Sequence, residues 1–208
     1  MMRDGMERGA VPERARALID FWFGPPGDAD RENHRQIWFK STPEHDDRLR
    51  DLFLADFERA AAGALEAWEA GPESALALLL LLDQIPRNIF RASPRAYATD
   101  AAARAAADRA LARGFDAAFP LAWRKFFYMP FHHSEDLADQ RRSVTLFEAL
   151  PRERDPDDRE ERGGLRRYGH PYVEVIELFG RFPHRNAILG RASTPEELAF
   201  MEKARSSS

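Results

Sequence analysis

Apolar residues recur every three or four positions along most of this chain, which is the period of helices buried on one face. The most regular stripe runs through Leu49, Phe53, Phe57, Ala60, Ala64 and Trp68. Patterns that alternate at every second residue, as strands require, are almost absent. The chain is therefore predicted to be all-α.

The same periodicity predicts further helices over residues 12–23, 73–83, 100–113, 121–131, 134–150, 172–179 and a short stretch after residue 194. Pro86 is expected to end the apolar central helix, and Pro130 to break the aromatic one. Thr99 and Ser134 are the expected N-caps of the helices that follow them. Thr194 to Glu197 has the pattern of a capping box.

About eight to nine helices joined by short loops predict one domain of stacked antiparallel helical hairpins, similar to a tetratricopeptide (TPR-like) superhelix. The expected domain covers residues 10–203 of the 208. A charged, helix-poor loop is expected at residues 151–164, with flexible ends at residues 1–9 and 204–208.

Composition narrows the function classes. Thirty-one Lys and Arg against 35 Asp and Glu leave a net charge of −4, which argues against a generally basic nucleic-acid binder. The chain has no cysteine, so disulfides and thiolate chemistry are excluded. The longest apolar run, residues 75–82, is too short to span a membrane, and residues 1–9 lack the apolar core of a secretory signal. We expect a cytoplasmic protein with neither nucleic-acid nor membrane partners; the pattern assigns no oligomeric state.

Polar residues interrupt the apolar pattern in three clusters. The first covers residues 83–91 and the third residues 180–191, and both contain an apolar residue followed by proline and then Arg-Asn. The second combines Arg124 and Tyr128 with residues 132–136 and Gln140. Buried polar groups need partners, so the three clusters are expected to meet in one cleft.

These clusters also carry a family resemblance. The segments LLDQIPRNIFRASPRAYATDAAA, FFYMPFHHSEDLADQRRSVTLF and FGRFPHRNAILGRASTPEE resemble the bacterial family catalogued as domain of unknown function 924. The amino-terminal ALIDFWFG and WFKSTPEHDD resemble the same family, so the likeness covers about residues 15–202. It implies an all-helical, tetratricopeptide-like fold and supplies no activity, cofactor or catalytic residue.

The arginines of the clusters have two interpretations. Guanidinium groups suit bidentate recognition of carboxylate or phosphate, and the local excess of positive charge in the first and third clusters would attract an anion. Alternatively Asp83, Glu135 and Asp136 neutralise the arginines as buried ion pairs. Each Asn can equally be the residue at which a helix stops.

Helical spacing would place His132, Glu135 and Asp136 on one face, and a histidine with carboxylates on one face is what a metal site requires. Asp83, His170 and His184 would have to complete it. The paired motifs of known metal sites are missing, so no metal is expected. Ser134 beside His132 and His133 lacks a nucleophile elbow, and no glycine loop could cradle a nucleotide, so no cofactor is expected.

These observations predict a binding protein for an anionic small molecule or a peptide C-terminus. The expected anion contacts are Arg87, Arg124 and Arg185, and the expected orienting groups are Asn88, Asn186 and Tyr128. The alternative is a hydrolase or lyase acting on an anionic substrate, with His132 or His184 as general acid or base.

Overall fold

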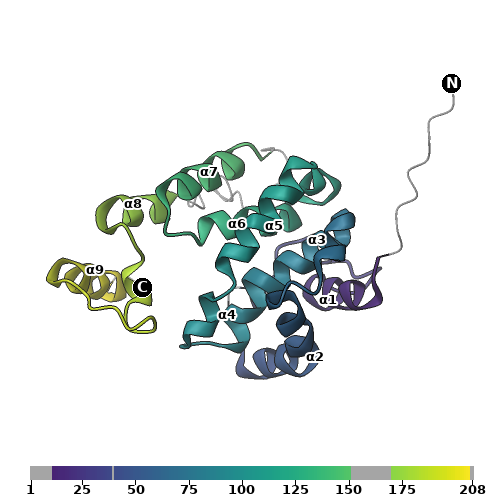
Figure 1. Ribbon diagram of the computed structural model, residues 1–208, viewed down its shortest axis with the longest axis horizontal. Helices are drawn as coiled ribbons and strands as arrows, with labels where there is room; N and C mark the ends of the chain where they lie inside the picture. Colours follow the sequence, from purple (N-terminus) through teal and green to yellow (C-terminus); the bar gives the residue numbers. More distant parts are fainter. Residues whose placement is uncertain (1–10, 39, 151–169, 207–208) are drawn as a thin grey trace.

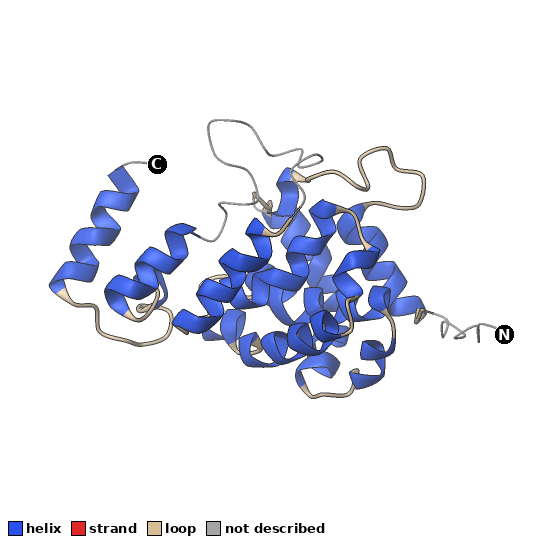
Figure 2. Ribbon diagram, turned by 90° about the horizontal axis from the view of Figure 1, so that it is seen from above, coloured by secondary structure: helices blue, strands red, loops and turns tan. Residues whose placement is uncertain are grey.

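The apolar stripes become helices in the computed structural model, which describes residues 11–38, 40–150 and 170–206 (Figure 1). All regular structure in those residues is helical (Figure 2), as predicted. The helices are α1 (Glu13–Phe23), α2 (Pro43–Ala61), α3 (Pro72–Leu79), α4 (Ile85–Ile89), α5 (Asp100–Ala112), α6 (Leu121–His132), α7 (Leu137–Glu148), α8 (His170–Phe179) and α9 (Pro195–Ser206). No helix among the described residues is long and apolar enough to cross a membrane.

The helices pack in sequence around a buried α3. Helices α1 and α5 contact α3 and α2 contacts α4, while α6, α7 and α8 each pack on the helix before. The core continues from α1 to Leu150 as a single cluster, with Phe23 stacked on Trp123 at a centroid distance of 3.8 Å. A single all-α domain is thus confirmed. The superhelix and the domain bounds stay predictions; the loop 151–164 and the end 1–9 lie outside the described residues, whereas residues 204–206 belong to α9.

Pro86 does not end the central helix, contrary to the prediction. Between α3 and α4 the backbone winds as a π-helix over Leu80–Gln84, and the Ile85 N–H donates to the carbonyl of Leu80 five residues back. Proline cannot supply the N–H that Leu82 would receive in a regular helix. The hydroxyl of Thr99 donates to that Leu82 carbonyl instead, at 2.6 Å. The wider turn continues the helix and carries Asp83 into the interior, where it is 1% exposed.

Three further predictions about helix ends, those for Pro130, Ser134 and Thr99, are wrong. Pro130 lies inside an unbroken α6, and α7 is capped by Asp136, whose carboxylate accepts from the N–H groups of Ala138 and Asp139. Thr99 precedes α5 but makes no side-chain cap, because its hydroxyl is used at Leu82.

The capping box of α9 is confirmed. Thr194 accepts from the N–H of Glu197, and the Glu197 carboxylate accepts from the N–H of Thr194. Both partners are local in sequence, which is why the motif could be read without tertiary information.

Replacing Thr99 by Val should lower the free energy of unfolding by about 1–3 kcal/mol, because a buried carbonyl loses its donor. Thr145→Val is the matched control, since its hydroxyl donates to Arg141 on an exposed face. The control should change stability by less than about 0.5 kcal/mol in urea unfolding. Equal losses in the two variants would contradict the role assigned to Thr99.

Candidate functional site

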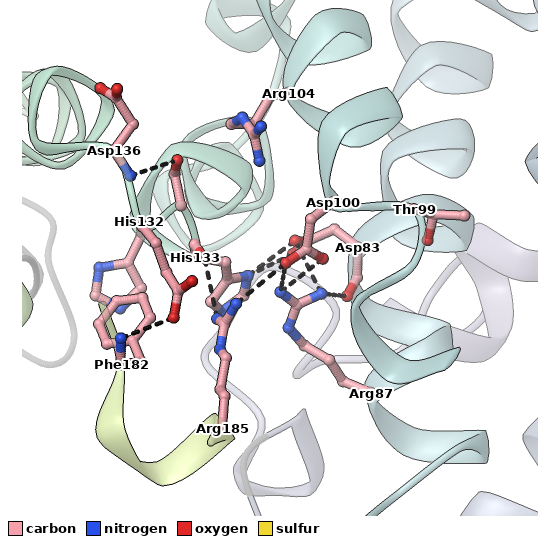
Figure 3. A network of polar contacts seen from close by, with 12 residues as sticks. Asp83, Arg87, Thr99, Asp100, Arg104, His132, His133, Asp136, Phe182 and Arg185 are labelled. Carbon is pink, nitrogen blue, oxygen red and sulfur yellow. Dashed lines mark hydrogen bonds and ion pairs between the residues drawn. The ribbon is translucent and has the colours of Figure 1, made fainter. Parts of the chain in front are cut away.

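Five charged or titratable side chains from distant parts of the chain meet at the end of the central helix (Figure 3). We call them the Asp83 network. Its members are Asp83 of the π-turn, Arg87 of α4, Asp100 at the start of α5, His133 just after α6 and Arg185 of the 3₁₀ turn Pro183–Arg185.

Asp83 is the most buried member and accepts bonds from three side chains. His133 Nδ1 lies 2.8 Å from Asp83 Oδ1, Gln84 Nε2 donates to Oδ2 at 2.5 Å, and Arg87 Nη1 lies 3.2 Å from Oδ1. Burial alone would raise the pKa of this carboxyl. The charge of Arg87, together with the hydrogen bonds from His133 and Gln84, holds the pKa well below its usual range. Asp83 is therefore an anion at neutral pH.

His133 is oriented by Asp83 in the manner of a catalytic acid–histidine pair. A carboxylate can only accept, so Nδ1 carries the proton and Nε2 keeps its lone pair. The described residues supply no hydrogen-bond partner for Nε2, and the side chain is 13% exposed. Burial and the charge of Arg87 lower the pKa of His133 below 6.5, against the opposing effect of Asp83. The imidazole is neutral at pH 7 and can accept a proton there.

Arg87 and Arg185 converge on the carboxylate of Asp100. Arg87 Nη2 lies 2.9 Å from Asp100 Oδ1 and 3.0 Å from Oδ2, and Arg185 Nη1 donates to Oδ2 at 3.3 Å. Both guanidinium groups also lie over the ring of Tyr97, at 5.7 Å and 4.5 Å from its centroid. The ion-pair interpretation of the arginines is thus realised, by Asp83 and Asp100 for Arg87 and by Asp100 for Arg185.

The ion pairs are unevenly shared. Arg87 also donates to the carbonyl of Asp83, and Arg185 donates to the carbonyl of His133 at 2.9 Å. Burial raises the pKa of Asp100 and outweighs the opposing charge of Arg87. Burial and the neighbouring charge of Arg87 lower the pKa of Arg185, whose Nε is buried without an acceptor among the described residues. Arg185 is the least neutralised cation of the network.

His132, the expected acid or base, faces the other way. Its ring stacks on Tyr172 at a centroid distance of 4.1 Å and meets the edge of Phe147. Burial and the adjacent His133 lower the pKa of His132 well below 6.5. The histidine whose ring nitrogen contacts the Asp83 carboxylate is His133.

Tyr128 and Arg124 lie together but outside the Asp83 network. The Tyr128 hydroxyl donates to Asp116 at 2.7 Å, and burial followed by this bond raises its pKa. Arg124 donates to the carbonyls of Phe119 and Ala117. Both side chains thus hold the turn at residues 115–119, which precedes α6, against that helix.

The two Arg-Asn pairs do not lie side by side. Asn88 donates to Asp46, which also receives Arg91, and so ties α4 to α2. Asn186 donates to Ser193 and Glu197 at the start of α9. Each amide has a structural partner, and only the preceding arginines reach the Asp83 network.

His184 lies apart as well, in an apolar groove between α8 and α9 with a volume of about 790 Å³. Tyr172, Leu178, Phe182 and Phe200 form much of its wall. Burial and the nearby Arg185 lower the pKa of His184. The expectation of one cleft shared by Arg87, Tyr128, His132 and His184 therefore does not describe the arrangement found.

The other acidic residues considered for a metal have structural partners. Asp136 caps α7 and Glu135 receives a double contact from Arg191. Across the described ranges, no three His, Asp or Glu side chains are grouped so that they could hold a metal ion.

Asp100 and His133 are not among the site residues that the sequence predicts, and Asp83 enters only as an ion-pair partner of the arginines or as a metal ligand. One signal was available, since Asp83 and Arg87 are four residues apart in a helical stretch and such pairs attract. Asp100 looked like an ordinary first-turn acid, and nothing local distinguishes His133 from His132. Their convergence depends on how α5, α6 and the segment at Arg185 pack.

The fold and the Asp83 network define an all-helical protein with a buried Asp–His pair joined to two arginines. The chain belongs to the family described as bacterial protein of unknown function (DUF924), whose model matches residues 18–205. The resemblance inferred from the sequence is thereby confirmed. The chain is similar to the solved structure of the protein of unknown function ATU0120 from Agrobacterium tumefaciens, with 39% identity and a TM-score of 0.76 over 91% of this chain and 97% of that one. No curated protein matches the chain.

Asp83→Asn should lower the pKa of His133 further, because the Asp83 carboxylate is what favours the imidazolium form. An NMR titration of the histidine ring nitrogens measures the shift. His45 on α2, whose nearest acid is Asp46, should titrate as in the wild type. A rise in the pKa of His133 would contradict the pairing with Asp83.

Arg87→Ala should lower the free energy of unfolding by about 3–5 kcal/mol at pH 7, because two buried carboxylates lose their main cation. The deficit should shrink as the pH falls, since burial raises the pKa of Asp100 and the loss of Arg87 raises it further, so that Asp100 takes up a proton in the folded variant. Arg109→Ala is the control: its double contact with Glu69 is exposed and worth about 0–1 kcal/mol. A deficit that does not change with pH would contradict the assignment.

Proposed function

We propose that this chain binds a small anionic ligand through a carboxylate held by Arg185 beside His133. The observation that carries the proposal is the incomplete neutralisation of Arg185. Its one carboxylate partner is Asp100, shared with Arg87, and its Nε has no acceptor among the described residues. Buried donors in native proteins are nearly always satisfied, so an unsatisfied one requires an explanation, and an acceptor supplied by a bound molecule is one.

The surroundings of Arg185 suit a planar anion. Its guanidinium lies between the rings of Tyr97 and Phe182, at 4.5 Å and 4.7 Å from their centroids. Such stacking holds the plane of the group and orients its donors, as bidentate carboxylate recognition requires. Arg87 supports the site without holding the ligand, since its own donors already bind Asp83 and Asp100.

The ligand class remains the one expected from the sequence, a small anionic molecule or a peptide C-terminus. Asn88, Asn186, Arg124 and Tyr128 are not part of the proposal, because their polar groups already bind Asp46, Glu197, backbone carbonyls and Asp116. A cytoplasmic location and the absence of nucleic-acid partners stay predictions.

A second candidate function is supported by the Asp83–His133 pair itself. A neutral imidazole oriented through Nδ1 by a buried carboxylate can act as a general base at Nε2. In a hydrolase or lyase of an anionic substrate, Arg185 would hold the carboxylate and His133 would take or return a proton. His133 replaces His132 and His184 in this role, because its Nδ1 lies 2.8 Å from the Asp83 carboxylate.

A thermal-shift screen of the whole chain against small carboxylates and peptides with free or amidated C-termini tests the proposal. A ligand at 100 times its dissociation constant should stabilise the protein by about 2.7 kcal/mol, equivalent to about 5–10 °C. Arg185→Lys keeps the charge but loses the planar donors, so its affinity should fall about tenfold or more.

Arg181→Lys is the matched control, because Arg181 lies on the same segment and binds Glu197 away from the Asp83 network. It should respond to the ligand as the wild type does. Equal responses from both variants, or no response of the wild type to any carboxylate, would overturn the proposed function.

A further inference from the structure

Asp100 occupies the position in which a carboxylate ligand would meet the two arginines. Its side chain is 12% exposed, and both guanidinium groups direct Nη donors at it. An incoming carboxylate at Arg185 therefore competes for the same donors. In the free protein the Asp100 carboxylate therefore takes the place that the carboxylate of the ligand would occupy.

The charges of the network balance before any ligand arrives. Arg87 and Arg185 carry two positive charges, Asp83 and Asp100 carry two negative charges, and His133 is neutral. A bound anion would leave one uncompensated negative charge in a buried place, which is strongly unfavourable. Uptake of one proton restores the balance.

From this arrangement, and resting on the proposed function, we infer that a carboxylate binds at Arg185 together with one proton, and that Asp100 is the residue that accepts the proton. The groups that face Asp100 are Arg87 from α4, Asp83 from the π-turn, His133 from the end of α6 and Arg185 from the 3₁₀ turn. The ligand withdraws Arg185 from Asp100 and adds a second negative charge beside it. Both effects favour the neutral carboxylic acid.

Asp100 is the residue whose ion pair a ligand at Arg185 takes away, because Arg185 is one of the two cations on its carboxylate. Burial already raises the pKa of Asp100 in the free protein. The contact of His133 with Asp83 is also left intact by a ligand at Arg185. The proton coupling thus makes Asp100 a specificity-determining residue that favours binding at lower pH.

Formate is a suitable probe, because it is the smallest carboxylate and stays ionised between pH 6 and 8. Its dissociation constant is measured by NMR titration of the full chain, at constant ionic strength with chloride. The wild type should bind formate up to about tenfold more weakly for each unit of rising pH, and a pH-stat should record uptake of about one proton per formate bound.

Asp100→Asn mimics the protonated acid and should bind formate with the same affinity at pH 6 and pH 8 and without proton uptake. Asp139→Asn is the matched control, since Asp139 pairs with Arg104 and Ser134 outside the network, and it should keep the wild-type pH dependence. The pH-stat result on the wild type stands even if a variant fails to fold.

The outcomes separate this inference from the proposed function. Formate binding that is independent of pH and takes up no proton overturns the inference and leaves carboxylate binding in place. A wild-type pH dependence in Asp100→Asn overturns the assignment of the proton to Asp100. Failure of the wild type and of Asp100→Asn to bind formate or any screened carboxylate at either pH overturns both proposals.

Discussion

A single buried carboxylate, that of Asp83, sets the requirements that the surrounding structure meets. An ionised group that is 1% exposed is tolerated only with several donors, and these come from Gln84, Arg87 and His133. These contacts hold the start of α4 and the end of α6 next to the same carboxylate. The π-turn that carries Asp83 inward in turn needs the hydroxyl of Thr99, because Pro86 has no N–H to offer. The hydrogen bonding of the π-turn and the ion pairs of the network are thus joined through the neighbouring residues Thr99 and Asp100.

The same residues serve as a structural ion-pair network and as a candidate binding site, and the two interpretations of the arginines are not exclusive. Asp83 and Asp100 neutralise Arg87 thoroughly, whereas Arg185 shares one carboxylate at longer range. A network that is balanced overall but unevenly shared has one weakly held cation. An external anion gains the most electrostatic stabilisation at Arg185. The protein also loses the least stabilisation there when the ion pair of Arg185 with Asp100 is exchanged for the ligand.

Helices and the α9 capping box could be predicted because periodicity and caps are local properties of the sequence. The effect of Pro86 could not, since a donor supplied thirteen residues later decides whether the helix stops. The arginines of the site were recognised by their residue type, but their partners depend on packing. His132 and His133 are adjacent and identical in chemistry, and only the direction in which α6 ends determines which one faces Asp83 and which one stacks on Tyr172.

Arg185 reaches Asp100 across 85 residues of sequence, whereas Asp83, Arg87 and Asp100 lie within one short stretch. Closing a long loop costs more entropy, so the short stretch can assemble while the rest of the chain is still being synthesised. Without Arg185 the cluster holds two carboxylates and one guanidinium, a net charge of 1 − 2 = −1. The contact of Arg185 with Asp100 is therefore the long-range step that balances a cluster whose other ion pairs are local in sequence.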